Sequence, residues 1–346
     1  MKLIELFICF NFVILIVNGH RKFKFNPGDW DRHKMIHNLS YHEPRKENYH
    51  RISFFSNLGR IYHHNIRADK GYETYRLGTN RYSDMEFSDF ARRMLNYKPT
   101  TGNVRQLYHY NNNKRKSSIN GAINRPQSNE SLQSLDWRDS GFVARVKNQG
   151  LCGSCWAFSV IAAIESSTAI ARNRSVEELS EQNLIDCSKK NYGCKGGRLD
   201  LAFQFVLDNG GVDTESSYPY EGDTIGECRF NSSTVGAAIQ SYRSILPKAE
   251  DDLLDAATNH VVSAAIQVTQ GFQLYSGGIF DDPTCSNNEE DLNHAIAIIG
   301  FGSSGGQDWW LIKNSWGPTW GENGYGRIAR GKNTCGIAFN AIYPVV

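Results

Sequence analysis

The chain is poor in proline and methionine, and it has no long hydrophobic run after its first residues. Only 9 of its 346 residues are proline and 4 are methionine, which excludes a collagen-like repeat and a proline-rich disordered chain. A membrane span needs about 20 consecutive apolar residues, and we expect none here. Hydrophobic residues make up 40% of the chain. The sequence therefore predicts a globular protein of roughly two or three folding units.

The first residues have the pattern of a secretory signal peptide. Met1 and Lys2 precede an apolar stretch over residues 3–17, and the small residue Gly19 follows it. Because this stretch is shorter than a membrane span, a buried or membrane-anchoring helix is the less favoured alternative. We expect residues 1–19 to be removed and the protein to reach the lysosome or the outside of the cell. Four Asn-x-Ser sequons are candidates for glycosylation on that route: Asn38, Asn129, Asn173 and Asn231.

The net charge of +2 hides a strong asymmetry along the chain. Residues 1–130 contain 22 Lys and Arg against 11 Asp and Glu, whereas residues 131–346 contain 16 against 25. The two parts should therefore attract each other, and the small overall charge does not indicate a nucleic-acid partner. Histidine is equally uneven, since only His260 and His294 lie after residue 130. A general base in the second part has to be one of these two.

Cysteine is absent from residue 10 to residue 151. Without Cys9 of the expected signal peptide, an odd number remains, which in a secreted protein suggests three disulfides and one thiol kept free. The pairing stays open at this point. Cys152 and Cys155 form a C-x-x-C, so a thiol-disulfide oxidoreductase or half of a zinc site is an alternative; no second such pair supplies ligands, and we expect no metal or cofactor. The seven cysteines are Cys152, Cys155, Cys187, Cys194, Cys228, Cys285 and Cys335.

The first third of the chain combines a helical stripe, a turn and a linker. Gly78 and Asn80 permit a turn or a bulge. From residue 97 to about residue 130 the sequence is polar, with a basic run at residues 114–116, which predicts a solvated linker that a protease could cut. The stripe over residues 47–65 has helical spacing and consists of Glu47, Arg51, Phe54, Asn57, Ile61 and Asn65.

After Trp137 the composition becomes apolar and rich in glycine, with helices first and strands afterwards. This order predicts an α+β unit with two segregated subdomains and a cleft between them. Periodicity favours helices over residues 155–171, from Ser180 onward and over residues 199–207. Short apolar runs over residues 261–268, 294–299 and 309–313 are typical of buried strands.

Cys155 stands at the expected start of a helix, where backbone N–H groups and the helix dipole favour a thiolate. Such a nucleophile needs a proton acceptor. His294 is favoured over His260 because it begins an apolar strand that can border a cleft, whereas His260 follows a helix end. A buried structural histidine is the alternative for His294.

Three further residues fit the same chemistry. Asn314 ends a strand and can orient the imidazole through a hydrogen bond, as the third member of a catalytic triad does. Trp316 can shield that bond from water. Gln149, six residues before Cys155, carries an amide donor that could form an oxyanion hole together with the Cys155 backbone N–H.

These residues resemble the papain-like cysteine proteases, and within them the cathepsin L group. The resemblance implies that Cys155 is the nucleophile, His294 the base and then the acid, Asn314 the orienting residue and Gln149 the oxyanion donor. It also implies the disulfides Cys152–Cys194, Cys187–Cys228 and Cys285–Cys335. It covers nearly everything after the signal peptide, and its strongest stretches are residues 149–159, 179–188, 193–197, 292–295 and 313–317.

The resemblance extends to the first third of the chain. The stripe over residues 47–65 is similar to the ERFNIN helix of the propeptides of these proteases, and residues 78–84 resemble their G-x-N-x-F-x-D pattern with Tyr82 in place of Phe. This implies an inhibitory propeptide over residues 20–130 and a catalytic domain over residues 131–346, with a helical and a β-barrel-like subdomain. We expect acid to release the basic propeptide by protonating enzyme carboxylates and propeptide histidines.

The resemblance also implies substrate-binding residues, with one departure. At the expected floor of the S2 pocket stands Asn340, whose amide could bind a polar P2 group, although we predict an apolar P2 side chain. In cathepsin B an inserted His-containing loop blocks the cleft. We see no such insertion in this sequence, which favours endopeptidase action on proteins and peptides. We expect a monomer, possible inhibition by cystatin-type proteins, and, as a further alternative, a catalytically silent binding glycoprotein. The expected substrate-binding residues are Gly153, Gly196, Gly197, Leu199, Ala265, Leu292, Ala295, Trp316 and Asn340.

Overall fold

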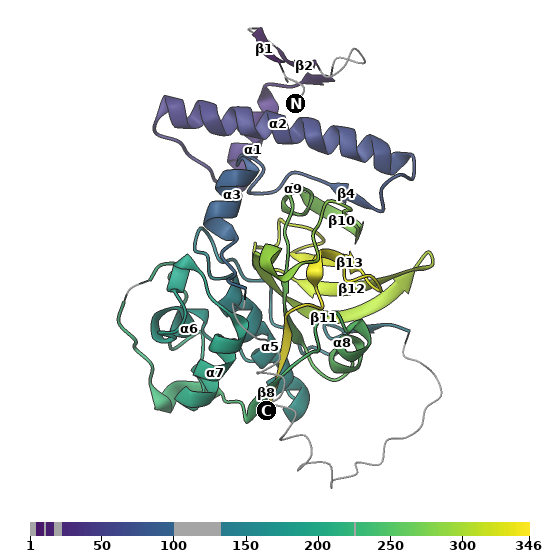
Figure 1. Ribbon diagram of the computed structural model, residues 1–346. Helices are drawn as coiled ribbons and strands as arrows, with labels where there is room; N and C mark the ends of the chain where they lie inside the picture. The colour runs from purple at the N-terminus through teal and green to yellow at the C-terminus, as the bar shows by residue number, and fades with distance from the viewer. Residues whose placement is uncertain (1–4, 10–11, 17–22, 100–132, 225) are drawn as a thin grey trace.

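The computed structural model describes residues 5–9, 12–16, 23–99, 133–224 and 226–346. The N-terminal segment, here residues 23–99, lies along one side of a larger body formed by the residues from 133 onward (Figure 1). That body consists of a helical subdomain and a sheet subdomain, as the order of helices and strands in the sequence predicted. No helix among these described ranges is long and apolar enough to cross a membrane.

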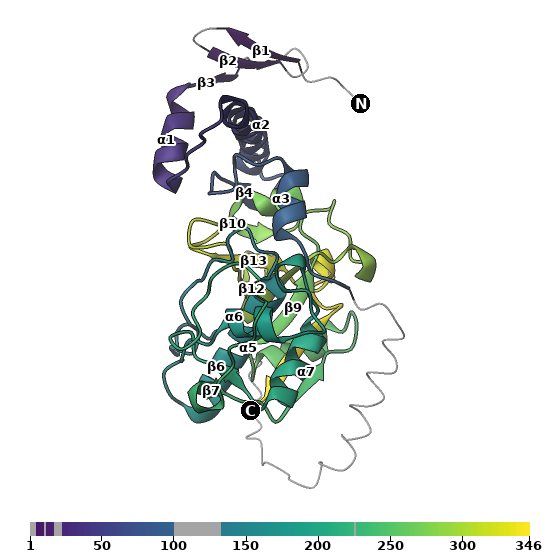
Figure 2. The ribbon, with the colours of Figure 1, turned by 90° about the vertical axis from the view of Figure 1, so that its left-hand side faces the viewer.

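The chain begins with a small antiparallel sheet of β1 (Glu5–Cys9), β2 (Phe12–Ile16) and β3 (Phe23–Phe25). Three helices and a strand follow: α1 (Gly28–His37), α2 (Pro44–Asp69), β4 (Tyr75–Leu77) and α3 (Phe87–Met94). Figure 2 shows α2 end-on, above β4 and α3. Trp30, Phe54 and Phe55 form a small core that fastens α1 and α2 together, so the N-terminal segment has apolar packing of its own.

The predicted helical stripe is confirmed as part of α2, but Arg51 does not lie on its inward face. Arg51 is exposed, and its Nη2 donates to Asn48 Oδ1 at 3.4 Å. His50 takes the inward position instead, since it lies four residues before the buried Phe54, and its Nδ1 is 3.3 Å from a carboxylate oxygen of Asp84. Helical spacing is compatible with either residue, since positions three and four apart share a face, and the contact with Asp84 shows that His50 is the one that faces inward.

The helical subdomain is built around α5 (Cys155–Arg172), which is buried on all sides over most of its length. α6 (Glu181–Cys187) begins as predicted after Ser180, whose Oγ accepts a hydrogen bond from the Asn183 N–H at 2.9 Å. The other elements are α7 (Leu199–Asn209), the 3₁₀ turns η1 (Gly193–Lys195) and η2 (Ser232–Thr234), and the short strands β6 (Val212–Asp213) and β7 (Val235–Ala237).

The sheet subdomain is one long, curved sheet with the strand order β4-β10-β13-β12-β11-β9-β14-β8 and β5 paired to β11. Its end strands, β4 and β8, are not neighbours, so the expected barrel does not close within the described ranges. β4 belongs to the N-terminal segment and pairs with β10 at one end of the sheet. The bounds are β5 (Leu135–Asp136), β8 (Ser241–Ser244), β9 (Val262–Ile266), β10 (Tyr275–Phe280), β11 (His294–Ser304), β12 (Gln307–Lys313), β13 (Tyr325–Ala329) and β14 (Ala341–Val345), with α8 (Glu250–Ala257), α9 (Gln270–Gln273), η3 (Glu289–Asp291) and η4 (Thr334–Gly336) between them.

The two subdomains meet where α5 packs against β11. Val160 and Ile164 of α5 share one apolar core with Ala297 and Ile299 of β11. Cys155 is the first residue of α5 and His294 the first residue of β11. The fold therefore brings a helix N-terminus and a strand start to the junction between the subdomains.

Candidate active site

Cys155 is fully buried and is the one cysteine with a free thiol from residue 133 onward among the residues described. Burial raises the pKa of this thiol to about 11, while the backbone N–H groups of Ala295 and Asn96 donate to the sulfur and act in the opposite direction. The thiolate expected at a helix N-terminus is therefore suppressed while the N-terminal segment covers Cys155. The bond from Ala295 places the sulfur one residue away from His294.

His294 is held by Asn314 and covered by Trp316. Its Nε2 lies 2.8 Å from Oδ1 of Asn314, and its ring centroid is 4.5 Å from that of Trp316. All three side chains are buried. Burial lowers the pKa of His294 to about 4, although the bond to Asn314 favours the protonated ring. Nδ1 has no hydrogen-bond partner among the described residues, so it is the ring nitrogen open to a reacting group.

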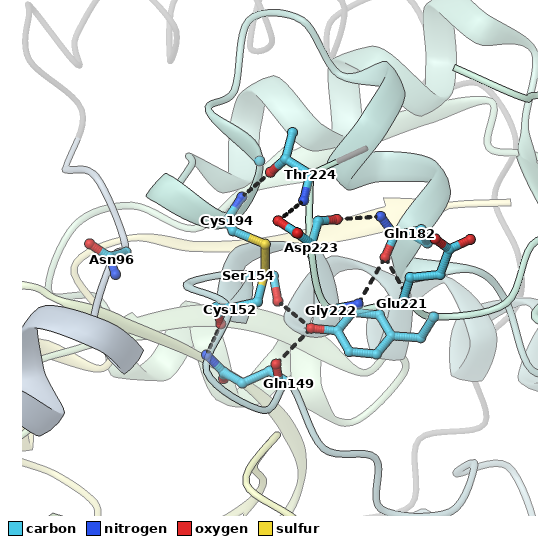
Figure 3. Close-up of a disulfide and its surroundings, with 12 residues drawn as sticks. Asn96, Gln149, Cys152, Ser154, Gln182, Cys194, Glu221, Gly222, Asp223 and Thr224 are labelled. Carbon is cyan, nitrogen blue, oxygen red and sulfur yellow. Dashed lines mark hydrogen bonds between the residues drawn. A yellow bond between two sulfur atoms is a disulfide. The ribbon is translucent and has the colours of Figure 1, made fainter. Parts of the chain in front are cut away.

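Gln149 points its amide nitrogen at the covered cleft. Its Oε1 accepts a hydrogen bond from Ser315 Oγ at 2.6 Å, which fixes the orientation of the amide. Its Nε2 donates to the Cys152 carbonyl at 2.9 Å and to the Met94 carbonyl at 3.3 Å. Figure 3 shows Gln149 beside Cys152. The donor predicted for an oxyanion is thus bound to a backbone carbonyl of the N-terminal segment.

Residues 96–98 run through the cleft, which makes the predicted start of the linker at residue 97 wrong. The Tyr97 N–H donates to the Asn293 carbonyl at 3.1 Å, and the Lys98 N–H donates to the Gly197 carbonyl at 2.9 Å. Tyr97 and Gly197 form a parallel β-bridge. The polar composition of this stretch hid its burial, because backbone hydrogen bonds to the cleft edges carry no sequence signal.

Two glycines of the cleft permit this close approach. Gly196 adopts φ +116°, and a Cβ there would collide with the Asn96 carbonyl oxygen. A Cβ on Gly153 would collide with the Asn96 side chain. The cleft wall at these positions is therefore bare backbone, open to a peptide chain.

The side chain of Tyr97 belongs to the same buried apolar cluster as residues expected to bind P2. It is 3% exposed and shares a buried cluster with Leu199, Ala265, Leu292 and Ala295. Asn340 lies beside them, since its carbonyl accepts the Ala265 N–H at 2.9 Å. The Tyr97 hydroxyl has no hydrogen-bond partner among the described residues. The residues expected to bind P2 are thus largely apolar, and an aromatic side chain is buried in the same cluster.

Three disulfides connect the cysteines in the pairing that the resemblance implied: Cys152–Cys194, Cys187–Cys228 and Cys285–Cys335. The first joins the loop of Gln149 to the loop of Gly196, next to Thr224, whose Oγ1 accepts the Cys194 N–H at 3.1 Å (Figure 3). Because Cys152 is bonded to Cys194 and not to Cys155, the C-x-x-C is not a redox pair.

His260 takes no part in the site. Its ring stacks on Tyr343 of β14 at 4.5 Å between centroids, and burial lowers its pKa. The choice of His294 rested on its place at the start of a strand, and that placement is confirmed.

Sequence reasoning missed a buried charge cluster behind the site. Lys147 Nζ donates to Glu165 and Glu181, each at 2.8 Å, and to the Leu179 carbonyl at 2.9 Å. The two carboxylates outweigh burial and raise the pKa of Lys147. Lysine two residues before the Gln149 motif was the only signal, and nothing in its spacing indicated burial. The cluster fixes the loop that carries Gln149 to the helices α5 and α6.

Comparisons with known proteins place this geometry in a family. The family model for papain family cysteine proteases matches residues 132–345, and that for the cathepsin propeptide inhibitor domain (I29) matches residues 30–90. Cathepsin L of Sarcophaga peregrina is 41% identical over 325 residues, which cover 92% of each chain. Digestive cysteine proteinase 1 of Homarus americanus is 41% identical and covers 93% of this chain and 95% of its own.

A solved structure agrees over the same range. Digestive procathepsin L 3 from the larval midgut of Tenebrio molitor has a TM-score of 0.79 and 39% identity, covering 92% of this chain and 98% of its own. None of these comparisons supports an oxidoreductase or a silent binding protein. The chain belongs to the papain family of cysteine proteases, as a cathepsin L-like proenzyme that carries its inhibitory propeptide.

Proposed function

We propose that Cys155 and His294 hydrolyse peptide bonds through an acyl-enzyme. His294 takes the thiol proton, the thiolate attacks the carbonyl carbon, and His294⁺ returns the proton to the leaving amine. A water then gives its proton to His294 and its oxygen to the acyl carbon, which frees the acid and the thiolate. Asn314 keeps Nδ1 directed at the sulfur by binding Nε2, and Gln149 with the Cys155 N–H stabilises the oxyanion.

The observation that carries this proposal is the path of the propeptide through the cleft. Its Met94 carbonyl accepts a hydrogen bond from the Gln149 amide, and its Asn96 N–H donates to the Cys155 sulfur. Burial therefore keeps both the imidazole and the thiol neutral between about pH 4 and about pH 11, the pKa values of the two groups in the proenzyme. Departure of the propeptide exposes both groups to water, which lowers the pKa of the thiol and raises that of the imidazole, the two directions that favour a thiolate–imidazolium ion pair.

We propose that acid triggers this departure. His33 contributes to it, because its protonation at low pH destabilises the folded propeptide. Burial beside Phe54 lowers the pKa of His33 from 6.5 to about 3, with smaller contributions from His37 and Arg81. The unfolded propeptide takes up this proton below 6.5 and the folded one does not, so stability falls as pH drops from about 6.5 towards about 3. Burial raises the pKa of Asp84, which works in the opposite direction.

The S2 pocket is proposed to select an apolar or aromatic P2 side chain. Tyr97 occupies it in the proenzyme, and its walls are Leu199, Ala265, Leu292 and Ala295. Asn340 stands next to Ala265 and offers an amide to a P2 group with a polar end. Leu and Phe should therefore be accepted, and a polar-tipped residue should be accepted better by this pocket than by one with an apolar floor.

The processing pattern follows the same proposal. Residues 1–19 are the signal peptide, residues 20–130 the propeptide and residues 131–346 the mature enzyme, which acts in the lysosome or outside the cell. Asn38, Asn173 and Asn231 are exposed and accessible to glycosylation; Asn129 lies outside the described residues. The mature enzyme is proposed to act as a monomer and to be open to cystatin-type inhibitors at its cleft.

An acid-activation assay tests the proposal. The purified proenzyme and its Cys155→Ala variant are brought to acid pH, and chain mass and cleavage of fluorogenic peptides with different P2 residues are followed. We expect a shortened, active chain only with Cys155 present, and a release pH that responds to ionic strength because opposite charges hold the propeptide. A folded, matured wild type that cleaves no peptide would refute the proposed activity.

A further inference from the structure

In the proenzyme, the propeptide completes one edge of the main sheet. β4 pairs antiparallel with β10, with Leu77 opposite Tyr275 and Tyr75 opposite Gly278. The other edge of β10 is held by β13, and Figure 1 shows β4 and β10 side by side at the end of the sheet. Removal of the propeptide leaves β10 as an edge strand, and an edge strand pairs readily with another extended segment.

The backbone of β10 offers both donors and acceptors to such a segment. Leu274 accepts a hydrogen bond from the Gly78 N–H at 2.8 Å, and the Ile279 N–H donates to the Thr74 carbonyl at 2.9 Å. The Ile279 carbonyl accepts a bond from Thr74 Oγ1 at 2.6 Å. Gly278 has φ +91°, and a Cβ there would meet the backbone of Thr74 and Tyr75. The edge is therefore bare at the point of closest approach, and each of these groups loses its partner when the propeptide leaves.

An apolar floor connects this edge to the catalytic histidine. Propeptide Tyr75 packs on Phe280 at 4.7 Å, and propeptide Phe90 packs on Trp316 at 5.0 Å between ring centroids. Trp316 in turn covers His294 at 4.5 Å. Removal of the propeptide uncovers these aromatic faces, so an apolar segment that binds the edge also regains burial there.

The charge around the edge disfavours acidic segments. The mature part contains 16 Lys and Arg against 25 Asp and Glu. Asp282, just past the end of β10, accepts hydrogen bonds from the Thr269 and Thr284 hydroxyls, at 2.7 Å to separate oxygens. Nearby Asp281 and Glu322 are each paired with a cation, Lys332 and Arg327. Facing this edge, β4 alternates buried Tyr75 and Leu77 with exposed, basic Arg76.

We propose that β10 (Tyr275–Phe280), together with Phe272 and Trp316, binds an extended segment of the protein substrate once the propeptide has left. We call these residues the β10 edge surface. The proposal rests on the proposed peptidase activity and deepens it: the surface selects protein substrates over short peptides. The segment has alternating apolar side chains with basic rather than acidic residues between them. A single chain can reach both sites, because the propeptide contacts β10 at residues 75–77 and Gln149 at Met94.

The chemistry fixes which side of the cleaved bond carries the segment. His294 must protonate the leaving amine, so the leaving part of the substrate lies next to His294 and Trp316. The Trp316 ring lies between His294 and the floor of the edge surface. The segment is therefore located C-terminal to the cleaved bond.

Matched peptides test the proposal with the wild-type mature enzyme. One fluorogenic cleavage sequence is extended on its C-terminal side by a Gly-Ser spacer of varied length and a Tyr-Arg-Leu-type segment. The controls carry the segment with N-methylated backbone nitrogens, or carry it on the N-terminal side. Because the added backbone hydrogen bonds must also offset the ordering of the segment, we expect a kcat/KM about tenfold higher than for either control, which corresponds to about 1.4 kcal/mol. Equal kcat/KM values for all peptides at every spacer length would overturn the proposal.

A charge variant checks the location. Ser276 is exposed on β10, so Ser276→Lys should repel the basic segment and remove most of the gain, while cleavage of the short peptide stays unchanged. Ser303→Lys, at the exposed end of β11, is the matched control and should keep the gain. Loss of short-peptide cleavage in the wild type would refute the proposed activity instead. A mature wild type that sediments as a dimer, and as a monomer after Ser276→Lys, would show that a second copy covers the edge and would overturn the proposal.

Discussion

Besides the pairing of β4 with β10, the propeptide meets the enzyme in two regions that differ in what they touch. Near Asn80 two hydrogen bonds join it to Gln273, which has no proposed role in the chemistry: Asn80 Nδ2 donates to the Gln273 carbonyl at 2.8 Å, and Gln273 Nε2 donates to the Tyr82 carbonyl at 3.0 Å. From Met94 to Tyr97 it touches the oxyanion donor, the thiol and the S2 pocket. We call residues 80–82 the anchor and residues 94–97 the plug. The anchor thus contributes to the affinity of the propeptide for the enzyme, and the plug inhibits the enzyme by covering its active site.

The largest expected effect comes from emptying the anchor. Tyr82 is 3% exposed, packs on Trp316 and Phe90, and donates to Asn148 at 3.2 Å. Replacing a buried aromatic side chain by alanine costs about 3–5 kcal/mol. Tyr82→Ala should therefore let the plug leave near neutral pH, and residual peptidase activity of the proenzyme at that pH measures the effect.

Tyr72→Ala serves as the control, because Tyr72 is 68% exposed and should keep the proenzyme silent. A Tyr82→Ala proenzyme that folds and stays as silent as wild type would break the comparison, since it would mean that the plug binds without the anchor.

A smaller effect is expected from His33, which lies in neither region but in the core that holds α1 against α2. Because the folded propeptide excludes a proton from His33, acid weakens the propeptide by up to about 1.4 kcal/mol for each pH unit below 6.5. His33→Phe keeps the ring stack with Phe54 and cannot be protonated. Its activation midpoint should therefore move to lower pH, as read from activity after incubation at graded pH.

His42→Phe, at an exposed position, should leave the midpoint where it is. A midpoint for His33→Phe that equals the wild-type value would show that acid acts on the anchor or the plug directly and not through the α1–α2 core.

The site was far easier to predict from the sequence than the plug. Cys155 and His294 each begin an element and Asn314 directly follows one, and a residue type at an element end indicates a role before the fold is known. Nothing comparable marks residues 96–98, whose hydrogen bonds to the cleft edges are made by backbone atoms and whose close approach depends on bare glycine walls.

The orientation of α2 is a second point that the sequence left open. Spacing predicted α2 but not which of two adjacent residues, His50 or Arg51, faces inward, because that depends on the elements packed against the helix. The sheet gave a third difference: its edge strand β4 comes from the propeptide, and no pattern within the catalytic part could indicate a strand supplied from outside it.

The smallest predicted effect sharpens the comparison at the plug. The Tyr97 hydroxyl is buried in the S2 pocket without a hydrogen-bond partner among the described residues, and an unsatisfied buried hydroxyl costs about 1–3 kcal/mol. Tyr97→Phe removes that cost, so the plug should bind more tightly and acid activation should slow by about tenfold if about 1.4 kcal/mol is recovered. The time course of activation at fixed pH measures this, with Tyr72→Phe as the control.

Faster activation of Tyr97→Phe would mean that the hydroxyl forms a hydrogen bond in solution, with water or with Asn340. The pocket would then be matched to tyrosine, and the plug would contribute affinity as the anchor does. Slower activation would instead show that the plug by itself binds weakly, that the anchor holds it in the active site, and that it leaves once the anchor dissociates.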